Sequence, residues 1–234
     1  MFIKQVIARN PAIFSRIYNH PFNQQLKAGT LPRDVFNFYL EQDALYLRDF
    51  STALKQLTKR FTDRSYAAQF RYFADDMIAA ELDIHLKYLG QNNSNTFFSA
   101  AKRRHLQKIP VISNYTNHLL YATENAPIAE AVLSCLPCFL IYKELGVQMN
   151  AYNQQNNPYY PWIASYSSKQ FVTSTQRMVQ TADELAAMVT CPAQRANLSK
   201  TFMQSIQFER LFFDAALIGK PSSLAERLDR QFQC

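Results

Sequence analysis

Four polar side chains occupy positions where helical spacing calls for apolar ones. Cys138 lies in the segment 136–142, the most apolar part of a long helical pattern. Asp43, Tyr115 and Glu209 each lie on an equally apolar face of another predicted helix. Burying a thiol and two carboxylates costs stability unless the groups have partners or a role. The pattern therefore predicts one interior site that combines a nucleophilic thiol, an acid–base carboxyl group and phenol hydrogen bonds.

The two carboxylates have the same surroundings. The helical neighbours of Asp43 are apolar or aromatic, namely Phe36, Tyr39, Tyr46, Leu47 and Phe50. The helical neighbours of Glu209 are Phe202, Ile206, Phe212, Phe213 and Ala216. Desolvation raises a carboxyl pKa, which suits a group that donates and recovers a proton near neutral pH. The alternative for each residue is a structural hydrogen bond to a tyrosine of another helix.

The cysteines and tyrosines also have an ordinary structural interpretation. Free cysteine is usually a small inert core residue, and any one of the 13 tyrosines is more often core than catalytic. Together, Tyr115 and Tyr142 would form aromatic walls around a flat heteroaromatic ligand. Cys135 and Cys138 have the spacing of a redox dithiol, but the βαβ context of such motifs is absent. Core packing is therefore the interpretation for Cys135.

A metal site is the competing chemistry. Glu81 and His85 share a helix face, and di-iron bundles use carboxylate and imidazole ligands one turn apart. Such sites need more than one such pair, whereas the chain has four histidines and none after residue 118. We therefore expect no metal and no other cofactor, and a di-iron oxidase remains the alternative enzyme.

Composition narrows the partners. The net charge is +7, and much of it falls in the run 102–108, which could bind an anionic surface or form the solvated start of a helix. No nucleic-acid motif accompanies the run, so we expect no nucleic-acid partner. The apolar window 128–147 is interrupted by Glu130, Lys143 and Glu144, which indicates a buried helix and no membrane span. Four cysteines without a disulfide framework, together with an N-terminus that lacks a secretory signal, predict a cytoplasmic protein.

Helical spacing continues along almost the whole chain, and only 4 glycines interrupt it. We expect one all-α domain, a helical bundle that spans residues 1–234. The predicted helices cover about 3–19, 32–59, 64–89, 97–124 (broken near Pro110), 127–152, 168–190 and 193–218, followed by a short tail helix. The segment 162–167 forms a short helix or a turn.

Several segments in this order resemble the TenA (thiaminase II) family of thiamin salvage. They are His20-Pro21-Phe22, residues 26–32 and 38–47, Leu136-Pro137-Cys138, residues 142–146 and 159–166, and the Glu209 helix. The resemblance implies a haem-oxygenase-like fold and a homotetramer. It also implies hydrolysis of 4-amino-5-aminomethyl-2-methylpyrimidine to the hydroxymethyl compound and ammonia, with slower cleavage of thiamin. A pyrimidine-binding protein without turnover is the remaining alternative.

The resemblance also assigns roles. It implies that Cys138 is the nucleophile and Glu209 the general acid–base. Asp43, Tyr142 and Tyr166 would contact the aminopyrimidine, Tyr115 would line the pocket, and Tyr46 would activate the thiol. The chain departs from common members at 164–165 and 167–168, where Ala-Ser and Ser-Ser stand in place of frequent glycine-containing sequences. These changes bear on substrate preference more than on the chemistry.

Overall fold

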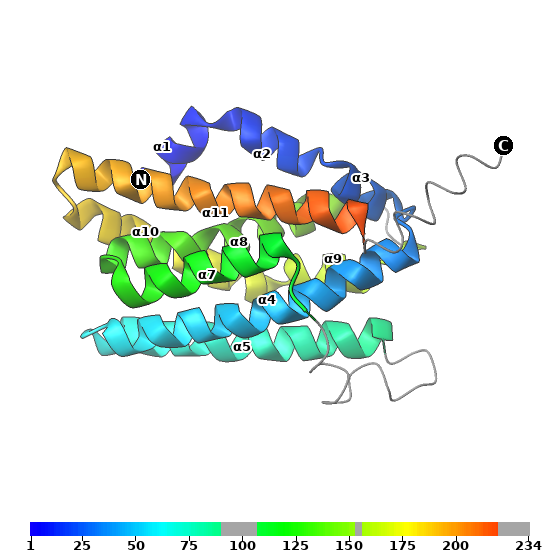
Figure 1. The fold of residues 1–234 in the computed structure, drawn as a ribbon, viewed down its shortest axis with the longest axis horizontal. Coiled ribbons are helices and arrows are strands. Elements are labelled where there is room, and N and C mark those ends of the chain that lie inside the picture. The colour runs from blue at the N-terminus through cyan, green and yellow to red at the C-terminus, as the bar shows by residue number, and fades with distance from the viewer. Residues whose placement is uncertain (90–106, 153–155, 220–234) are drawn as a thin grey trace.

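The computed structural model describes residues 1–89, 107–152 and 156–219 of the chain (Figure 1). The side chains of residues 77–78, 80–87 and 89 fall outside the described part. The described residues form helices and their connections, with no strand among them. The prediction of an all-α fold is confirmed.

Seven longer or central helices and three short N-terminal ones make up this part of the chain. In order they are α1 (Phe2–Arg9), α2 (Pro11–Tyr18), α3 (Pro21–Ala28), α4 (Arg33–Arg60), α5 (Arg64–Leu89), α7 (Pro110–Asn125), α8 (Ile128–Asn150), α9 (Tyr160–Tyr166), α10 (Lys169–Met188) and α11 (Pro192–Ile218).

Helix α8 is the centre of the bundle (Figure 1) and contacts α4, α7, α9, α10 and α11. All residues from 131 to 142 are buried, so this helix has no solvent face along more than three turns. Pro137 interrupts its hydrogen bonding, because proline has no N–H to donate to the carbonyl of Leu133. Cys138 follows directly and is placed in the middle of the core.

The outer helices cover α8 from two sides. Helix α5 packs along α4 on one side, and α1–α3 run across α10 and α11 on the opposite side (Figure 1). On these two sides α8 therefore lies beneath two layers of helix.

The N-terminal prediction was wrong in one respect. Residues 3–19 do not form one helix, because the chain breaks at Asn10 between α1 and α2. Proline disfavours the helical conformation of the preceding residue, and Asn10 accordingly adopts φ −130° and ψ 45° before Pro11. The sequence Asn10-Pro11 carried this signal.

Apart from the start predicted at residue 97, the bounds of the other predicted helices agree with the structure to within about two residues. Residues 162–166 belong to the short helix α9, and Ser167 is its C-cap. The break near Pro110 is confirmed, because α7 begins at that residue and residues 107–109 are not helical. The part of the prediction that covers 97–106, and the tail helix, lie outside the described residues.

Gly146 allows α9 to approach α8 closely. A Cβ atom at this position would lie 2.7 Å from the carbonyl carbon of Tyr166 and 2.8 Å from the amide nitrogen of Ser167. Both are backbone atoms at the end of α9, so neither can turn aside. The absence of a side chain at residue 146 thus determines how near Tyr166 lies to the central helix.

We expect Gly146→Ala to destabilise the protein by on the order of 1–2 kcal/mol, because the cost of overpacking exceeds the better helix propensity of alanine. Urea unfolding measures this change. Val147→Ala is the matched control, since Val147 is 43% exposed on the same helix and its truncation should have little effect. An alanine variant as stable as the wild type would show that α9 can move away freely.

Candidate active site

Five helices bring the seven predicted site residues into one buried cluster. The contributions are Asp43 and Tyr46 from α4, Tyr115 from α7, Cys138 and Tyr142 from α8, Tyr166 from α9 and Glu209 from α11. None of the seven is more than 9% exposed. The apolar helix faces that carry them therefore meet in a common interior.

Glu209 is the acidic centre of the cluster. It is 1% exposed, and its Oε1 accepts a 2.8 Å hydrogen bond from the hydroxyl of Tyr115. Burial raises the pKa of this carboxyl group to about 8, although the Tyr115 hydrogen bond lowers it. At neutral pH the group is mostly protonated and close to its titration point. These are the properties of a general acid–base group.

Cys138 lies beside Glu209 and Tyr46. Burial, followed by the charge of Glu209, raises the pKa of its thiol well above the ordinary value. The Tyr46 hydroxyl opposes this rise: it is buried without a hydrogen bond of regular geometry, yet it lies close enough to favour the thiolate. The free protein therefore holds a neutral thiol at neutral pH. Ionisation of this thiol has to be coupled to another proton transfer.

Aromatic packing holds the hydroxyl groups in place. The ring of Tyr115 lies 4.9 Å from that of Tyr46 and stacks at 5.1 Å on Phe208, measured between ring centroids. This stack joins α4, α7 and α11 beside the carboxyl group. The Tyr115 phenol is therefore fixed by two ring contacts as well as by its hydrogen bond.

On the other side of the cluster, Asp43 lies close to two phenols. Besides burial, its charge contributes to the raised pKa of Tyr39 and of Tyr142. The Tyr39 hydroxyl donates a 3.1 Å hydrogen bond to the Tyr142 hydroxyl. Because the Tyr142 oxygen accepts this bond, its own proton is available to a different acceptor.

Tyr166 completes this wall. Its ring lies 4.9 Å from that of Tyr142 and 4.7 Å from that of Trp162. Trp162 is fully buried, and its Nε1–H finds no hydrogen-bond acceptor among the described residues. A buried N–H donor without a partner is costly in a folded chain, so it is a candidate contact for a bound ligand.

Sequence reasoning missed Tyr39 and Trp162 as site residues. Tyr39 lies one turn before Asp43 on the same stripe, so its position could have been inferred from helical spacing. Its bond to Tyr142 could not, because it joins two helices. Trp162 lies on a segment whose helical state the sequence left open.

Cys135 packs as a core residue. It is fully buried one turn before Cys138, and burial raises the pKa of its thiol to about 12. Both thiols are free. These observations agree with the interpretation of Cys135 as core.

The metal hypothesis concerns residues whose side chains are not described. Glu81 and His85 lie on α5 in the stretch 80–87. Among the described side chains, no group of three histidine, cysteine, aspartate or glutamate residues gathers in a metal-binding arrangement.

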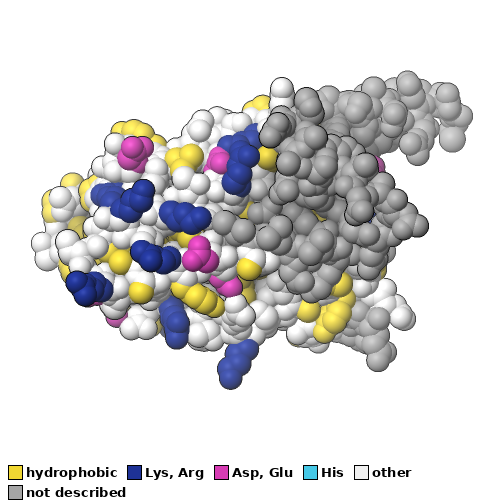
Figure 2. All heavy atoms as spheres, turned by 90° about the horizontal axis from the view of Figure 1, so that it is seen from below, with side chains coloured by type: hydrophobic (Ala, Val, Ile, Leu, Met, Phe, Trp, Pro, Cys, Tyr) yellow, Lys and Arg dark blue, Asp and Glu magenta, His cyan; other side chains and the backbone are white. Residues whose placement is uncertain are grey.

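The predicted basic run is described only at its end. Residues 102–106 fall outside the described part, and Lys108 is partly buried in an ion pair with Asp49. The prediction of a solvated helix start is thus wrong for Lys108, which precedes α7 and faces inward. On the side where α4 and α5 lie, cationic side chains alternate with acidic and apolar ones over the described surface (Figure 2).

Residues 8–218 match the TENA/THI-4/PQQC family. The chain is a member of that family. It is 30% identical over 205 residues to the thiamine biosynthesis multifunctional protein ThiED of Corynebacterium efficiens. The matched residues make up 87% of this chain but only 26% of that protein. It is also 25% identical to the aminopyrimidine aminohydrolase of Halalkalibacterium halodurans, over 92% of this chain and 95% of the enzyme.

Solved structures share the fold. A TenA homologue from P. horikoshii superposes with a TM-score of 0.81 at 24% identity, covering 94% of this chain and all of the homologue. A domain from Shewanella denitrificans described as having a heme oxygenase-like fold gives a TM-score of 0.65 at 12% identity, over 92% of this chain and 91% of the domain. The haem-oxygenase-like fold predicted from the resemblance is confirmed.

None of the described helices is both long and apolar enough to cross a membrane.

The raised pKa of Glu209 makes stability depend on pH. The folded protein holds this proton up to about pH 8, whereas the unfolded chain releases it near the ordinary value of 4.5. Between these two values the folded state binds more protons, so its stability falls as pH rises. We expect Glu209→Gln, which keeps the acceptor for Tyr115, to match the wild type at pH 5 and to exceed it by a few kcal/mol at pH 9.

Urea unfolding of both proteins at the two pH values measures this difference. Subtracting the unfolding free energy of the wild type from that of Glu209→Gln at each pH cancels the contributions of the other titrating groups. A constant difference across the pH range would show that Glu209 is not buried as a neutral acid.

Proposed function

We propose that this protein is an aminopyrimidine aminohydrolase that acts by covalent cysteine catalysis. The observation that carries the proposal is the meeting of Cys138 with a buried carboxyl group whose pKa lies near 8. The family membership and the aminopyrimidine aminohydrolases among the relatives support the same reaction class. The substrate is 4-amino-5-aminomethyl-2-methylpyrimidine, and the products are the hydroxymethyl compound and ammonia.

In the first step the sulfur of Cys138 forms a bond to a carbon of the electron-poor ring. Glu209 gives its proton to a ring nitrogen and takes up the proton that leaves the thiol, so the net change is addition of S–H across a ring C=N bond. Aromaticity is lost, and the ring electrons then expel the exocyclic amine from the methylene carbon. The ring nitrogen gives up its proton to the departing –NH2 group, which leaves as ammonia. Covalent catalysis thus replaces one difficult displacement with two easier steps.

In the second half of the reaction, the oxygen of a water molecule bonds to the methylene carbon, and a proton of that water molecule returns to the ring nitrogen. The ring then rearomatises as the carbon–sulfur bond breaks, and Glu209 carries the ring proton back to sulfur. The enzyme is restored, and the overall change is exchange of –NH2 for –OH.

The remaining residues hold the ring. Asp43 offers a carboxylate to the amino group of an aminopyrimidine, while Tyr142 and Tyr166 supply aromatic faces and hydroxyl groups. Tyr46 lies beside the thiol, and Tyr115 holds the acid. Placement of this kind contributes to the rate because small displacements of reacting atoms are costly. Thiamin, which carries the same aminopyrimidine, is proposed as a slower substrate.

Ammonia release from the aminomethylpyrimidine tests the proposal. We expect Cys138→Ala to lower the rate by about 10³-fold or more, because no other described thiol lies at the site. Cys135→Ala is the matched control: it removes a buried thiol one turn away on the same helix and should retain close to the wild-type rate. Turnover by folded Cys138→Ala at the wild-type rate would refute the role of Cys138 as the nucleophile.

Glu209→Gln should lower the same rate by roughly 10²–10⁴-fold, since it keeps the shape of the side chain and removes its proton. The assay also separates the alternatives. Binding of the pyrimidine without ammonia release would indicate a binding protein, and stoichiometric iron in the purified protein would favour a di-iron oxidase.

The homotetramer implied by the family resemblance stays a prediction. Light scattering of the purified chain measures the assembly directly.

A further inference from the structure

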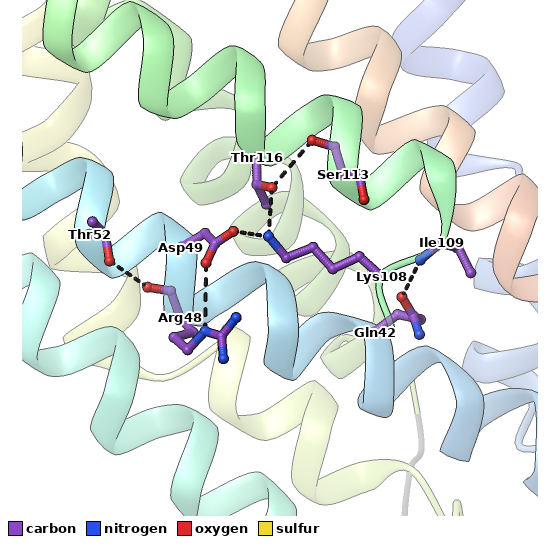
Figure 3. Close-up of polar contacts among 8 residues, drawn as sticks. All are labelled: Gln42, Arg48, Asp49, Thr52, Lys108, Ile109, Ser113 and Thr116. Atoms are coloured by element: carbon purple, nitrogen blue, oxygen red, sulfur yellow. Dashed lines mark hydrogen bonds and ion pairs between the residues drawn. The ribbon is translucent and has the colours of Figure 1, made fainter. Parts of the chain in front are cut away.

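Two polar clamps tie the start of α7 to α4 (Figure 3). The first is Gln42, which is 2% exposed. Its Nε2 donates a 3.1 Å hydrogen bond to the carbonyl of Gln107, and its Oε1 accepts a 3.0 Å bond from the amide of Ile109. One buried amide thus binds the backbone on both sides of Lys108.

The second clamp is the side chain of Lys108. Its Nζ forms an ion pair with Asp49 of α4 and donates a 3.1 Å hydrogen bond to Oγ1 of Thr116 on α7. The side chains of Lys108 and Asp49 are 23% and 15% exposed, and Thr116 is fully buried. A partly buried ion pair is expensive to open, because removal of one partner leaves the other charge poorly solvated.

The clamps lie on either side of the contact between Tyr46 and Tyr115. On α4, Gln42 immediately precedes Asp43, and Asp49 lies one turn beyond Tyr46. On α7, Thr116 immediately follows Tyr115. Polar bonds thus join α4 to α7 on both sides of the contact between the Tyr46 and Tyr115 rings, whose centroids lie 4.9 Å apart.

The position of Tyr115 in turn determines the state of Glu209. Its hydroxyl is the donor in the 2.8 Å bond to the carboxyl group, and this bond opposes the effect of burial on the acid. A displacement of α7 relative to α4 would change the geometry of this 2.8 Å bond.

We propose that Lys108 is a positioning residue: by bridging Asp49 and Thr116 it holds Tyr115 against Glu209 in the geometry that the reaction needs. The consequence for rate rests on the proposed function, whereas the positioning itself is measurable without substrate. An ion pair with a purely structural role would change the stability of the protein and leave the Glu209 proton unaffected.

The test follows the protonation of the Glu209 carboxyl group by infrared spectroscopy during a pH titration. For each variant, the spectrum of the same variant with Glu209→Gln added is subtracted, so that only the Glu209 signal remains. We expect Lys108→Met and Thr116→Val to raise the pKa of Glu209, because the lowering effect of the Tyr115 bond is weakened. Lys108→Arg, which keeps the charge and hydrogen-bond donors, should stay near the wild type. Thr116→Val keeps the lysine charge and removes its hydrogen bond to α7, together with the 3.4 Å bond from the Thr116 hydroxyl to the carbonyl of Ser113. It therefore separates geometry from long-range electrostatics.

Arg48→Met is the matched control. Arg48 lies 3.6 Å from the same Asp49 carboxylate, but its side chain is 67% exposed and it does not reach α7. Its loss should leave the Glu209 titration unchanged. A double-mutant cycle with Tyr115→Phe completes the design: if Lys108 acts through Tyr115, Lys108→Met adds no further shift once the phenol is gone.

With substrate, we expect Lys108→Met to lower the rate of ammonia release on the order of 10-fold. The alkaline limb of the pH–rate profile should move to higher pH. Unchanged Glu209 titration in both Lys108→Met and Thr116→Val would overturn the proposal. If Lys108→Met does not fold, Thr116→Val alone decides. If the wild type releases no ammonia, the proposed function fails, while the titration still accepts or rejects the positioning role.

Discussion

The carboxyl group of Glu209 is 1% exposed, and the Tyr115 phenol donates a hydrogen bond to it. An ionised carboxylate in such a place is very costly, and the chain avoids that cost by keeping the group protonated. The arrangement lasts only as long as α7 and α11 stay in register, because the donor and acceptor are on different helices. Much of the surrounding packing serves to keep that register.

Three features of the bundle position the site residues by different means. Phe208 stacks on Tyr115 and so uses apolar contact to hold the phenol against α11. Gln42 and Lys108 use polar bonds to fix the start of α7 on α4. Gly146 uses the absence of a side chain to bring the end of α9 onto α8. Each of the three acts at a different border of the site.

The sequence predicts features that lie within one helix better than contacts that join two helices. Helical spacing identified the faces of Asp43 and Glu209, because a carboxylate inside an apolar stripe conflicts with its surroundings on one helix alone. It failed at Asn10, where a proline effect outweighed the apolar pattern. It also failed for Lys108, because a long side chain can reach from a charged run into the interior, and spacing does not show where its end lies. The Tyr39–Tyr142 bond joins residues 103 positions apart, and no pattern within one helix contains it.

The protonation of Cys138 and Glu209 constrains the chemistry more tightly than either group alone. The charge of Glu209 raises the pKa of the Cys138 thiol, so the two resist being anionic together. If Glu209 gave its proton to a substrate ring while the thiol ionised to solvent, the site would hold two negative charges in a dry interior. Transfer of the thiol proton to Glu209, as that carboxyl group protonates the ring, keeps at most one. The neutral thiol of the free protein is therefore compatible with nucleophilic catalysis, provided that the electron-poor ring receives the proton as the sulfur attacks. Without a bound ring, Glu209 keeps its own proton and cannot accept that of the thiol, so the mechanism predicts a neutral Cys138 until a suitable ring is bound.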